Sequence, residues 1–114
     1  MTRRTLAALL LTLALLPATP AGAHGGYLAN VSAYCDQGWT ASGRWTAWGT
    51  AAGASWLPLG SIVAVSSYGD VLVTDRGVPG LFDLDLSMPG DCGAAWNWGR
   101  RWLPITVLRW GWGS

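Results

Sequence analysis

The apolar runs of this chain are short, and glycine interrupts them repeatedly. Sixteen glycines are spread over 114 residues, and after residue 24 no apolar run is long enough to span a membrane as a helix. Short runs rich in β-branched and aromatic residues, separated by turn-forming residues, are typical of strands. We therefore expect a small all-β domain.

Six strands and one short helix are predicted. The helix covers about residues 92–98, with Asp91 as its N-cap and Gly99 at its C-terminal end. A tight hairpin turn is expected at residues 68–70, and the prolines at 58, 79, 89 and 104 are expected at strand borders. A closed barrel fits this set because closure leaves no exposed strand edge. The predicted strands are residues 27–34, 46–51, 61–66, 71–74, 81–86 and 105–110.

Residues 1–23 have the pattern of a cleavable signal peptide. Arg3 and Arg4 precede an apolar stretch at residues 6–16, and the small residues 21–23 form the expected cleavage site. The mature protein would then be one domain, residues 24–114, that is secreted or periplasmic and has no stable membrane anchor. We expect it to be a monomer.

Charged residues are few, and this excludes several functions. The mature part has five arginines and six aspartates, a formal charge of −1, and the chain has neither lysine nor glutamate. Nucleic-acid binding is not expected without a basic surface. His24, at the predicted mature N-terminus, is similar to the copper-binding terminus of lytic polysaccharide monooxygenases. Those enzymes need a second histidine, which this chain lacks, so no metal or other cofactor is expected.

Cys35 and Cys92 are the two cysteines of the chain. In an exported domain they are most simply interpreted as one disulfide. The alternative is two unrelated buried thiols. A zinc site is not expected because two cysteines and one histidine, without close spacing, do not form a tetrahedral set.

A resemblance to a known family extends over about residues 31–109. It is carried by the segments LPLGSIVAVSSYGDVLVTDRG (57–77), LFDLDLS (81–87) and AAWNWGRRWLPITVL (94–108). In order and spacing they resemble the double-psi β-barrel of bacterial cell-wall proteins, in both the three-aspartate (3D) domain and the rare lipoprotein A and expansin branch. The resemblance implies a small six-stranded double-psi β-barrel with one short helix.

The same resemblance implies an activity. The enzymes of the family are lytic transglycosylases, which cleave peptidoglycan between N-acetylmuramic acid and N-acetylglucosamine without water and form a 1,6-anhydro ring. One carboxyl group acts first as acid and then as base. The resemblance places Asp85 in this role and Asp75 at the preceding turn.

Asp83 is a rival for the acid/base role because residues two apart on a strand share a face. The alternatives are that Asp75 caps a turn and that Asp83 pairs with an arginine on the barrel exterior. The other three aspartates fit loop or cap roles: Asp36, Asp70 and Asp91.

The chain departs from the family pattern just before residue 57. Where the three-aspartate domain has another aspartate and rare lipoprotein A has a histidine, this chain has Gly53-Ala54-Ser55-Trp56. The difference leaves open a non-catalytic, expansin-like module that binds peptidoglycan or another polysaccharide without cleaving it.

Nine tryptophans are more than a core of this size can bury. Flat indole faces stack on sugar rings, so we predict that Trp96, Trp98 and Trp110 bind substrate. Arg100 is predicted to bind the acidic groups of peptidoglycan, and the alternative is that it stacks on a nearby tryptophan. One alternative for the tryptophans is packing within the barrel. Another is a membrane-active segment at residues 96–112, although few arginines accompany the tryptophans there and no amphipathic helix is expected.

Overall fold

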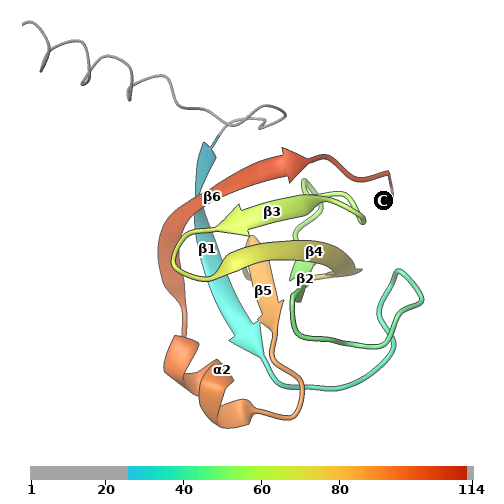
Figure 1. Ribbon diagram of the computed structural model, residues 1–114, viewed down its shortest axis with the longest axis vertical. Coiled ribbons are helices and arrows are strands. Elements are labelled where there is room, and N and C mark those ends of the chain that lie inside the picture. Colours follow the sequence, from blue (N-terminus) through green and yellow to red (C-terminus); the bar gives the residue numbers. More distant parts are fainter. Residues whose placement is uncertain (1–25, 113–114) are drawn as a thin grey trace, which may run out of the picture.

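The short apolar runs form six strands in the computed structural model, which describes residues 26–112 (Figure 1). The predicted signal peptide and His24 lie outside the described residues. Within residues 26–112 no helix is long and apolar enough to cross a membrane. The elements are β1 (Gly26–Tyr34), β2 (Thr50–Gly53), β3 (Ile62–Val65), β4 (Gly69–Arg76), β5 (Leu84–Ser87), α2 (Cys92–Trp98) and β6 (Arg101–Arg109).

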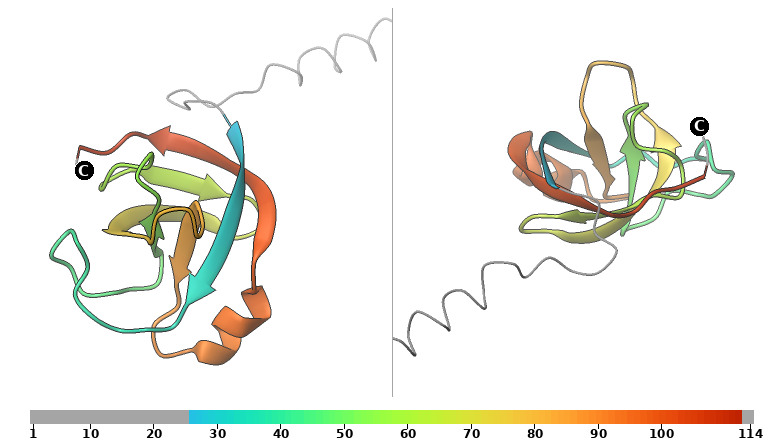
Figure 2. Two further views of the ribbon diagram at one scale, coloured as in Figure 1. Left: turned by 180° about the vertical axis from the view of Figure 1, so that it is seen from behind. Right: turned by 90° about the horizontal axis from the view of Figure 1, so that it is seen from above.

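The strands close into one barrel in the order β1-β5-β2-β4-β3-β6. The pairs β1–β5 and β2–β4 are parallel, and the other pairs are antiparallel. The prediction of a small all-β barrel with six strands and one short helix is confirmed. The β4–β5 connection, residues 77–83, projects from the barrel (Figure 2).

Two predicted strands start too early along the chain. Residues 46–49 are not in β2, because Gly49 has φ of 83° and ends the preceding turn in the left-handed region. Residues 81–83 likewise precede β5, and Gly80 in the turn before them has φ of 78°. The strands β4 and β6 are longer than predicted, because barrel closure pairs residues whose own sequence signal for a strand is weak.

The predicted hairpin joins β3 and β4, but its turn lies at residues 66–68. Pro104 was expected at a strand border and instead lies inside β6, opposite Leu28. Its carbonyl accepts the N–H of Ser66 at 3.2 Å. The nitrogen of an extended residue points to the same side as its carbonyl, here toward the hairpin turn, so the missing N–H of Pro104 removes no ladder bond.

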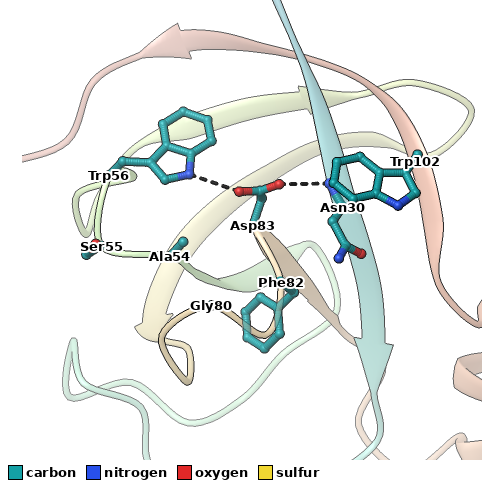
Figure 3. A pocket seen from close by; sticks show the side chains of 8 residues that line it. All are labelled: Asn30, Ala54, Ser55, Trp56, Gly80, Phe82, Asp83 and Trp102. Atoms are coloured by element: carbon teal, nitrogen blue, oxygen red, sulfur yellow. Dashed lines mark hydrogen bonds between the residues drawn. The ribbon is translucent and has the colours of Figure 1, made fainter.

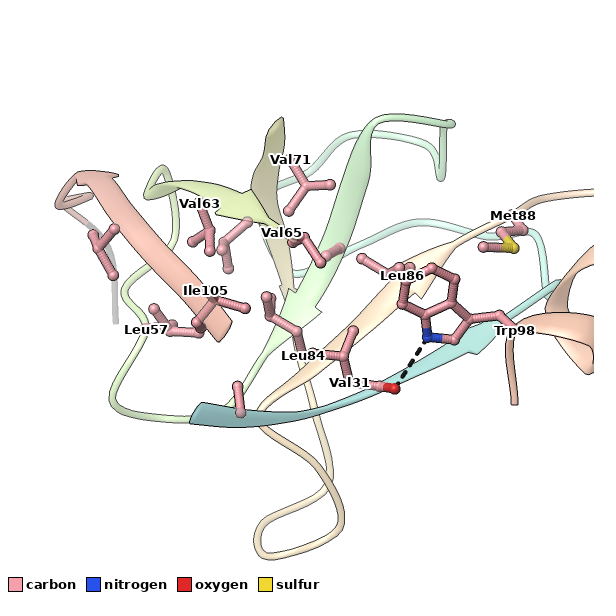
Figure 4. Close-up of a cluster of buried hydrophobic side chains, with 14 of the residues drawn as sticks. Val31, Leu57, Val63, Val65, Val71, Leu84, Leu86, Met88, Trp98 and Ile105 are labelled. Carbon is pink, nitrogen blue, oxygen red and sulfur yellow. Dashed lines mark hydrogen bonds between the residues drawn. The ribbon is translucent and has the colours of Figure 1, made fainter. Parts of the chain in front are cut away.

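The barrel interior is filled by aliphatic side chains from every strand (Figure 4). Leu57, from the β2–β3 connection, is fully buried among them. The largest fully buried aliphatic residues are Leu57, Leu84, Leu86, Ile105, Val31, Val63, Val71, Val73 and Val107. A core of β-branched and leucine residues on alternate strand positions leaves the intervening positions to the outer face.

Helix α2 has the predicted bounds and caps. The Asp91 side chain accepts the N–H of Ala94, and Gly99 ends the helix with φ of 66°. Trp98 is buried at 8% exposure, and its indole N–H donates to the Val31 carbonyl at 3.1 Å (Figure 4). The guanidinium of Arg101 lies 3.9 Å from the centre of the Trp98 ring. Trp98 thus attaches α2 to β1.

Cys35 and Cys92 form the predicted disulfide, with their Cα atoms 4.9 Å apart. The bond joins the residue after β1 to the first residue of α2. It closes a loop between positions 57 apart in sequence, so it restricts the unfolded chain strongly.

Replacing both cysteines, Cys35→Ser with Cys92→Ser, is expected to lower the free energy of unfolding by about 4 kcal/mol, the loop-closure entropy for a loop of this length. Guanidinium unfolding followed by tryptophan fluorescence measures the change. Wild type in reductant is the control and should match the double variant. Equal unfolding midpoints for oxidised wild type and the double variant would contradict this account.

Candidate active site

An acidic face lies on the outside of β5. Leu84 and Leu86 point into the core and are fully buried, so the alternating residues Asp83 and Asp85 point outward. Both aspartates are partly exposed. This agrees with the predicted common face.

Asp85 is half-buried beside β1, where the Ser32 hydroxyl donates a hydrogen bond of 2.8 Å to its Oδ1. Burial raises the pKa of Asp85 above the ordinary aspartate value, and the charge of Asp36 adds to this. The Ser32 hydrogen bond and the Arg100 charge lower the pKa, but burial outweighs them. Asp85 therefore keeps its proton to a higher pH than an exposed aspartate, as a general acid requires.

Asp75 reaches the same face from β4. Ala52 on β2 is paired with Asp85 on one side and with Asp75 on the other. The Oδ1 atom of Asp75 accepts the backbone N–H groups of Ala41 and Arg76, each at 2.9 Å. Asp75 thus holds the C-terminal end of β4 against the loop at residue 41, where a turn cap was considered above, and its charge acts on the nearby Tyr34 hydroxyl.

Tyr34, at the end of β1, stands among three carboxylates. Burial raises the pKa of its hydroxyl, the hydrogen bond from Ser87 lowers it, and the charges of Asp75, Asp85 and Asp36 raise it. The Ser87 hydroxyl donates to the Tyr34 oxygen at 2.8 Å. The Tyr34 hydroxyl consequently stays neutral across the physiological range and can donate its own proton to a ligand.

These hydroxyl residues were not among the predicted site residues. Their signal is present in β1, where polar residues 30, 32 and 34 alternate with the apolar residues 31 and 33. Such an alternation predicts a polar outer face on a strand. The hydroxyl groups that the structure adds to the site belong to Ser32, Tyr34, Thr50 and Ser87. The Thr50 hydroxyl donates to the Ser87 hydroxyl oxygen at 3.2 Å.

A pocket of about 400 Å³ opens beside Asp83 (Figure 3). The two oxygens of Asp83 accept the backbone N–H of Asn30 at 2.8 Å and the indole N–H of Trp56 at 3.1 Å. These partners replace the arginine that was considered for Asp83. Trp56 and Trp102 lie on opposite sides of the carboxylate (Figure 3). The lining residues are Asn30, Ala54, Ser55, Trp56, Gly80, Phe82, Asp83 and Trp102.

Arg76 holds the loop that carries Trp56. One of its terminal nitrogens, Nη1, donates to the carbonyls of Leu57 at 2.8 Å, Ala54 at 2.9 Å and Gly53 at 3.4 Å. This loop contains the residues that replace the third polar residue of the resembled family. Arg76, the last residue of β4, therefore fixes the position of one pocket wall.

Two of the predicted binding tryptophans lie away from the pocket wall. Trp98 is the anchor of α2 in the core, so its indole faces are covered and the prediction that it binds substrate is wrong. Its local sequence does not differ from that of an exposed tryptophan, and only the packing of α2 on β1 decides its burial. Trp96 is 83% exposed on α2 and does not line the pocket.

Arg100 and Trp110, the other two predicted binding residues, adjoin residues of the pocket. Arg100 donates to the Asn30 side-chain oxygen at 2.9 Å and to the Leu81 carbonyl at 2.7 Å. The Trp110 ring centre lies 6.5 Å from that of Trp56, and the Tyr27 ring lies 5.0 Å from Trp56. Trp56, which was not among the predicted binding residues, is thus the centre of an aromatic row with Tyr27 and Trp110.

The described residues do not offer an evident metal site: within 26–112 no group of three or more histidine, cysteine or acidic side chains is arranged to hold a metal ion. Comparison with known proteins adds no assignment. No family model, curated protein or solved structure matches the chain. The function therefore has to be argued from the acidic face and the pocket.

Replacing Asp85 by asparagine is expected to stabilise the fold at neutral pH. A raised carboxyl pKa means that the folded protein binds the proton more tightly than the unfolded chain, so ionisation of Asp85 destabilises the fold. Asparagine cannot ionise, and its oxygen can still accept from Ser32. The gain of Asp85→Asn over wild type should therefore shrink as the pH falls through the pKa of Asp85.

Thermal unfolding at a series of pH values measures this difference. Asp70→Asn, a change at an exposed aspartate of the β3–β4 hairpin, is the matched control and should leave the melting temperature nearly unchanged. A melting temperature of Asp85→Asn below wild type at neutral pH would show that burial of the charge is not the dominant effect.

Proposed function

We propose that this protein is an exported cell-wall enzyme that cleaves peptidoglycan between N-acetylmuramic acid and N-acetylglucosamine to give 1,6-anhydro products. The observation that carries the proposal is the half-buried Asp85, whose pKa burial raises, on one face with Asp75 and Tyr34. The resemblance of residues 57–77 and 81–87 to cell-wall barrels supplies the substrate class. A disulfide is compatible with an oxidising compartment outside the cytoplasm.

In the first step, protonated Asp85 donates its proton to the glycosidic oxygen. The bond between that oxygen and C1 of the muramic ring breaks, and N-acetylglucosamine leaves with a new hydroxyl group. Positive charge develops on the muramic ring. The carboxylate now present at Asp85 stabilises it electrostatically.

In the second step, the Asp85 carboxylate takes the proton of the muramic 6-hydroxyl. The 6-oxygen bonds to C1, the 1,6-anhydro ring closes and Asp85 is protonated again. One carboxyl group thus serves as acid and as base, and no water is consumed. Most glycoside hydrolases, in contrast, place two carboxyl groups at a set separation.

Ser32 and Tyr34 have supporting roles in this proposal. The Ser32 hydrogen bond orients the Asp85 carboxyl group on the side facing β1. The neutral Tyr34 hydroxyl is available to donate to a sugar oxygen. Asp75 acts mainly by holding the end of β4 against the loop at residue 41, because its Oδ1 already accepts two backbone N–H groups.

A non-catalytic, expansin-like glycan-binding module is the second candidate. It is favoured by the loop at residues 53–56, where the polar residue of the resembled family is replaced and the Trp56 indole is bonded to Asp83. In this case the same outer face binds peptidoglycan without cleaving it.

Digestion of purified peptidoglycan by the mature protein is expected to release muropeptides one water lighter than hydrolysis products, detectable by mass spectrometry. Asp85→Asn should reduce the rate by a factor of about 10² to 10⁴, the usual contribution of a general acid. The wild-type rate should fall as the pH rises through the pKa of Asp85, because the acid form starts the reaction.

Asp70→Asn is the matched control and should retain the wild-type rate. If wild-type protein sediments with peptidoglycan but releases no anhydro product, the enzyme proposal is refuted and the non-catalytic binding module is favoured. Equal rates for wild type and Asp85→Asn would instead refute the assignment of Asp85.

A further inference from the structure

The pocket beside Asp83 has the chemistry of a sugar-binding site. Trp56 is 37% exposed and Trp102 is 65% exposed, so both indoles present ring surface to solvent. They lie on opposite sides of the Asp83 carboxylate, and Phe82 lies below it (Figure 3). Aromatic rings flanking a hydrogen-bonding group suit a flat ligand with an apolar face and a polar edge.

Asp83 is held in a fixed orientation and keeps free acceptor capacity. Each of its oxygens accepts one protein hydrogen bond, from Asn30 or from Trp56. A carboxylate has about four acceptor positions, so roughly two stay available for a ligand. Neighbouring hydroxyl groups of a pyranose ring are donors that match this pair.

The surroundings favour a neutral ligand over a charged one. Asp83 lies in the pocket wall, and the cationic Arg100 donates to the side chain of Asn30 in the same wall. Arg100 does not line the pocket, but its positive charge next to Asn30 disfavours a cationic ligand, and the charge of Asp83 disfavours an anionic one. Uncharged hydroxyl groups can form hydrogen bonds in this pocket without repulsion from either charge.

We propose that the Asp83 pocket is a saccharide subsite in which a pyranose ring lies against the indoles of Trp56 and Trp102 and donates hydroxyl hydrogen bonds to Asp83. The subsite is separate from the reacting group at Asp85. Asp83 is a specificity-determining residue here, and it is not the acid. The inference rests on the proposed function only in taking a glycan as ligand.

The position of the subsite gives a direction to the bound glycan. Asp83 immediately precedes β5 and Asp85 is the second residue of that strand, a separation of roughly 7 Å for extended chain. A sugar in the pocket would therefore adjoin the sugar at Asp85, and the glycan would run along the outer face of β5. The row of Tyr27, Trp56 and Trp110 extends the aromatic surface beyond the pocket.

Binding of soluble oligomers tests the subsite without reference to cleavage. We expect oligomers of β-1,4-linked N-acetylglucosamine or of β-1,4-linked glucose to bind wild-type protein saturably in calorimetry and to shift the Trp56 indole N–H signal in NMR spectra. Trp56→Ala, Trp102→Ala and Asp83→Ala should each weaken binding about tenfold or more, a loss of about 1.4 kcal/mol or more.

Trp39→Ala removes a tryptophan outside the pocket that is 75% exposed, against 65% for Trp102, and is the matched control; it should bind as wild type does. Thermal unfolding identifies any variant that fails to fold, and the exposed Trp102 makes Trp102→Ala the safest change. Failure of both oligomers to bind, or binding that Trp56→Ala and Trp102→Ala leave unchanged, overturns the subsite. Trp56-dependent binding without anhydro product would overturn the proposed function and leave the subsite standing.

Discussion

The alternation of side chains along β5 is the constraint on which the site depends. Leu84 and Leu86 fill the barrel, and this forces Asp83 and Asp85 to the outside. Because β5 is bonded to β1 on one side and to β2 on the other, its outer face has strand neighbours on both sides. A shift of one residue in its register would bury both carboxylates and expose both leucines. The core therefore fixes the position of the acidic groups.

The general features of the fold were predictable from local signals in the sequence. The caps of α2 at Asp91 and Gly99 and the alternation of β5 each have a local cause, and the two cysteines of the chain allow a single intramolecular pair. Strand bounds were less predictable, because barrel closure sets them. Gly49 and Gly80 lie in turns with positive φ, and nothing in the neighbouring residues marks them as more than ordinary turn glycines.

The site was predictable only in part, because its residues meet through long-range pairing. Asp85 and Asp75 belong to sequence motifs, but Ser32 and Tyr34 join them only because β1 lies parallel to β5. The tryptophans are the clearest case. The sequence around Trp56 and around Trp98 does not show which of the two is buried. Trp56 lines a pocket and Trp98 anchors a helix, and only tertiary packing decides this difference.

Helix α2 is fastened to β1 at both of its ends. Cys92, its first residue, is bonded covalently to Cys35 just after β1, and Trp98, its last residue, donates to Val31 within β1. A seven-residue helix would ordinarily fray from its termini. Here neither terminus is free, so the disulfide and the Trp98 hydrogen bond both oppose separation of the helix from β1. Cys92 and Trp98 thus stabilise the position of β1, the strand that supplies Ser32 and Tyr34 to the site. Both residues lie far from Ser32 and Tyr34 in the sequence.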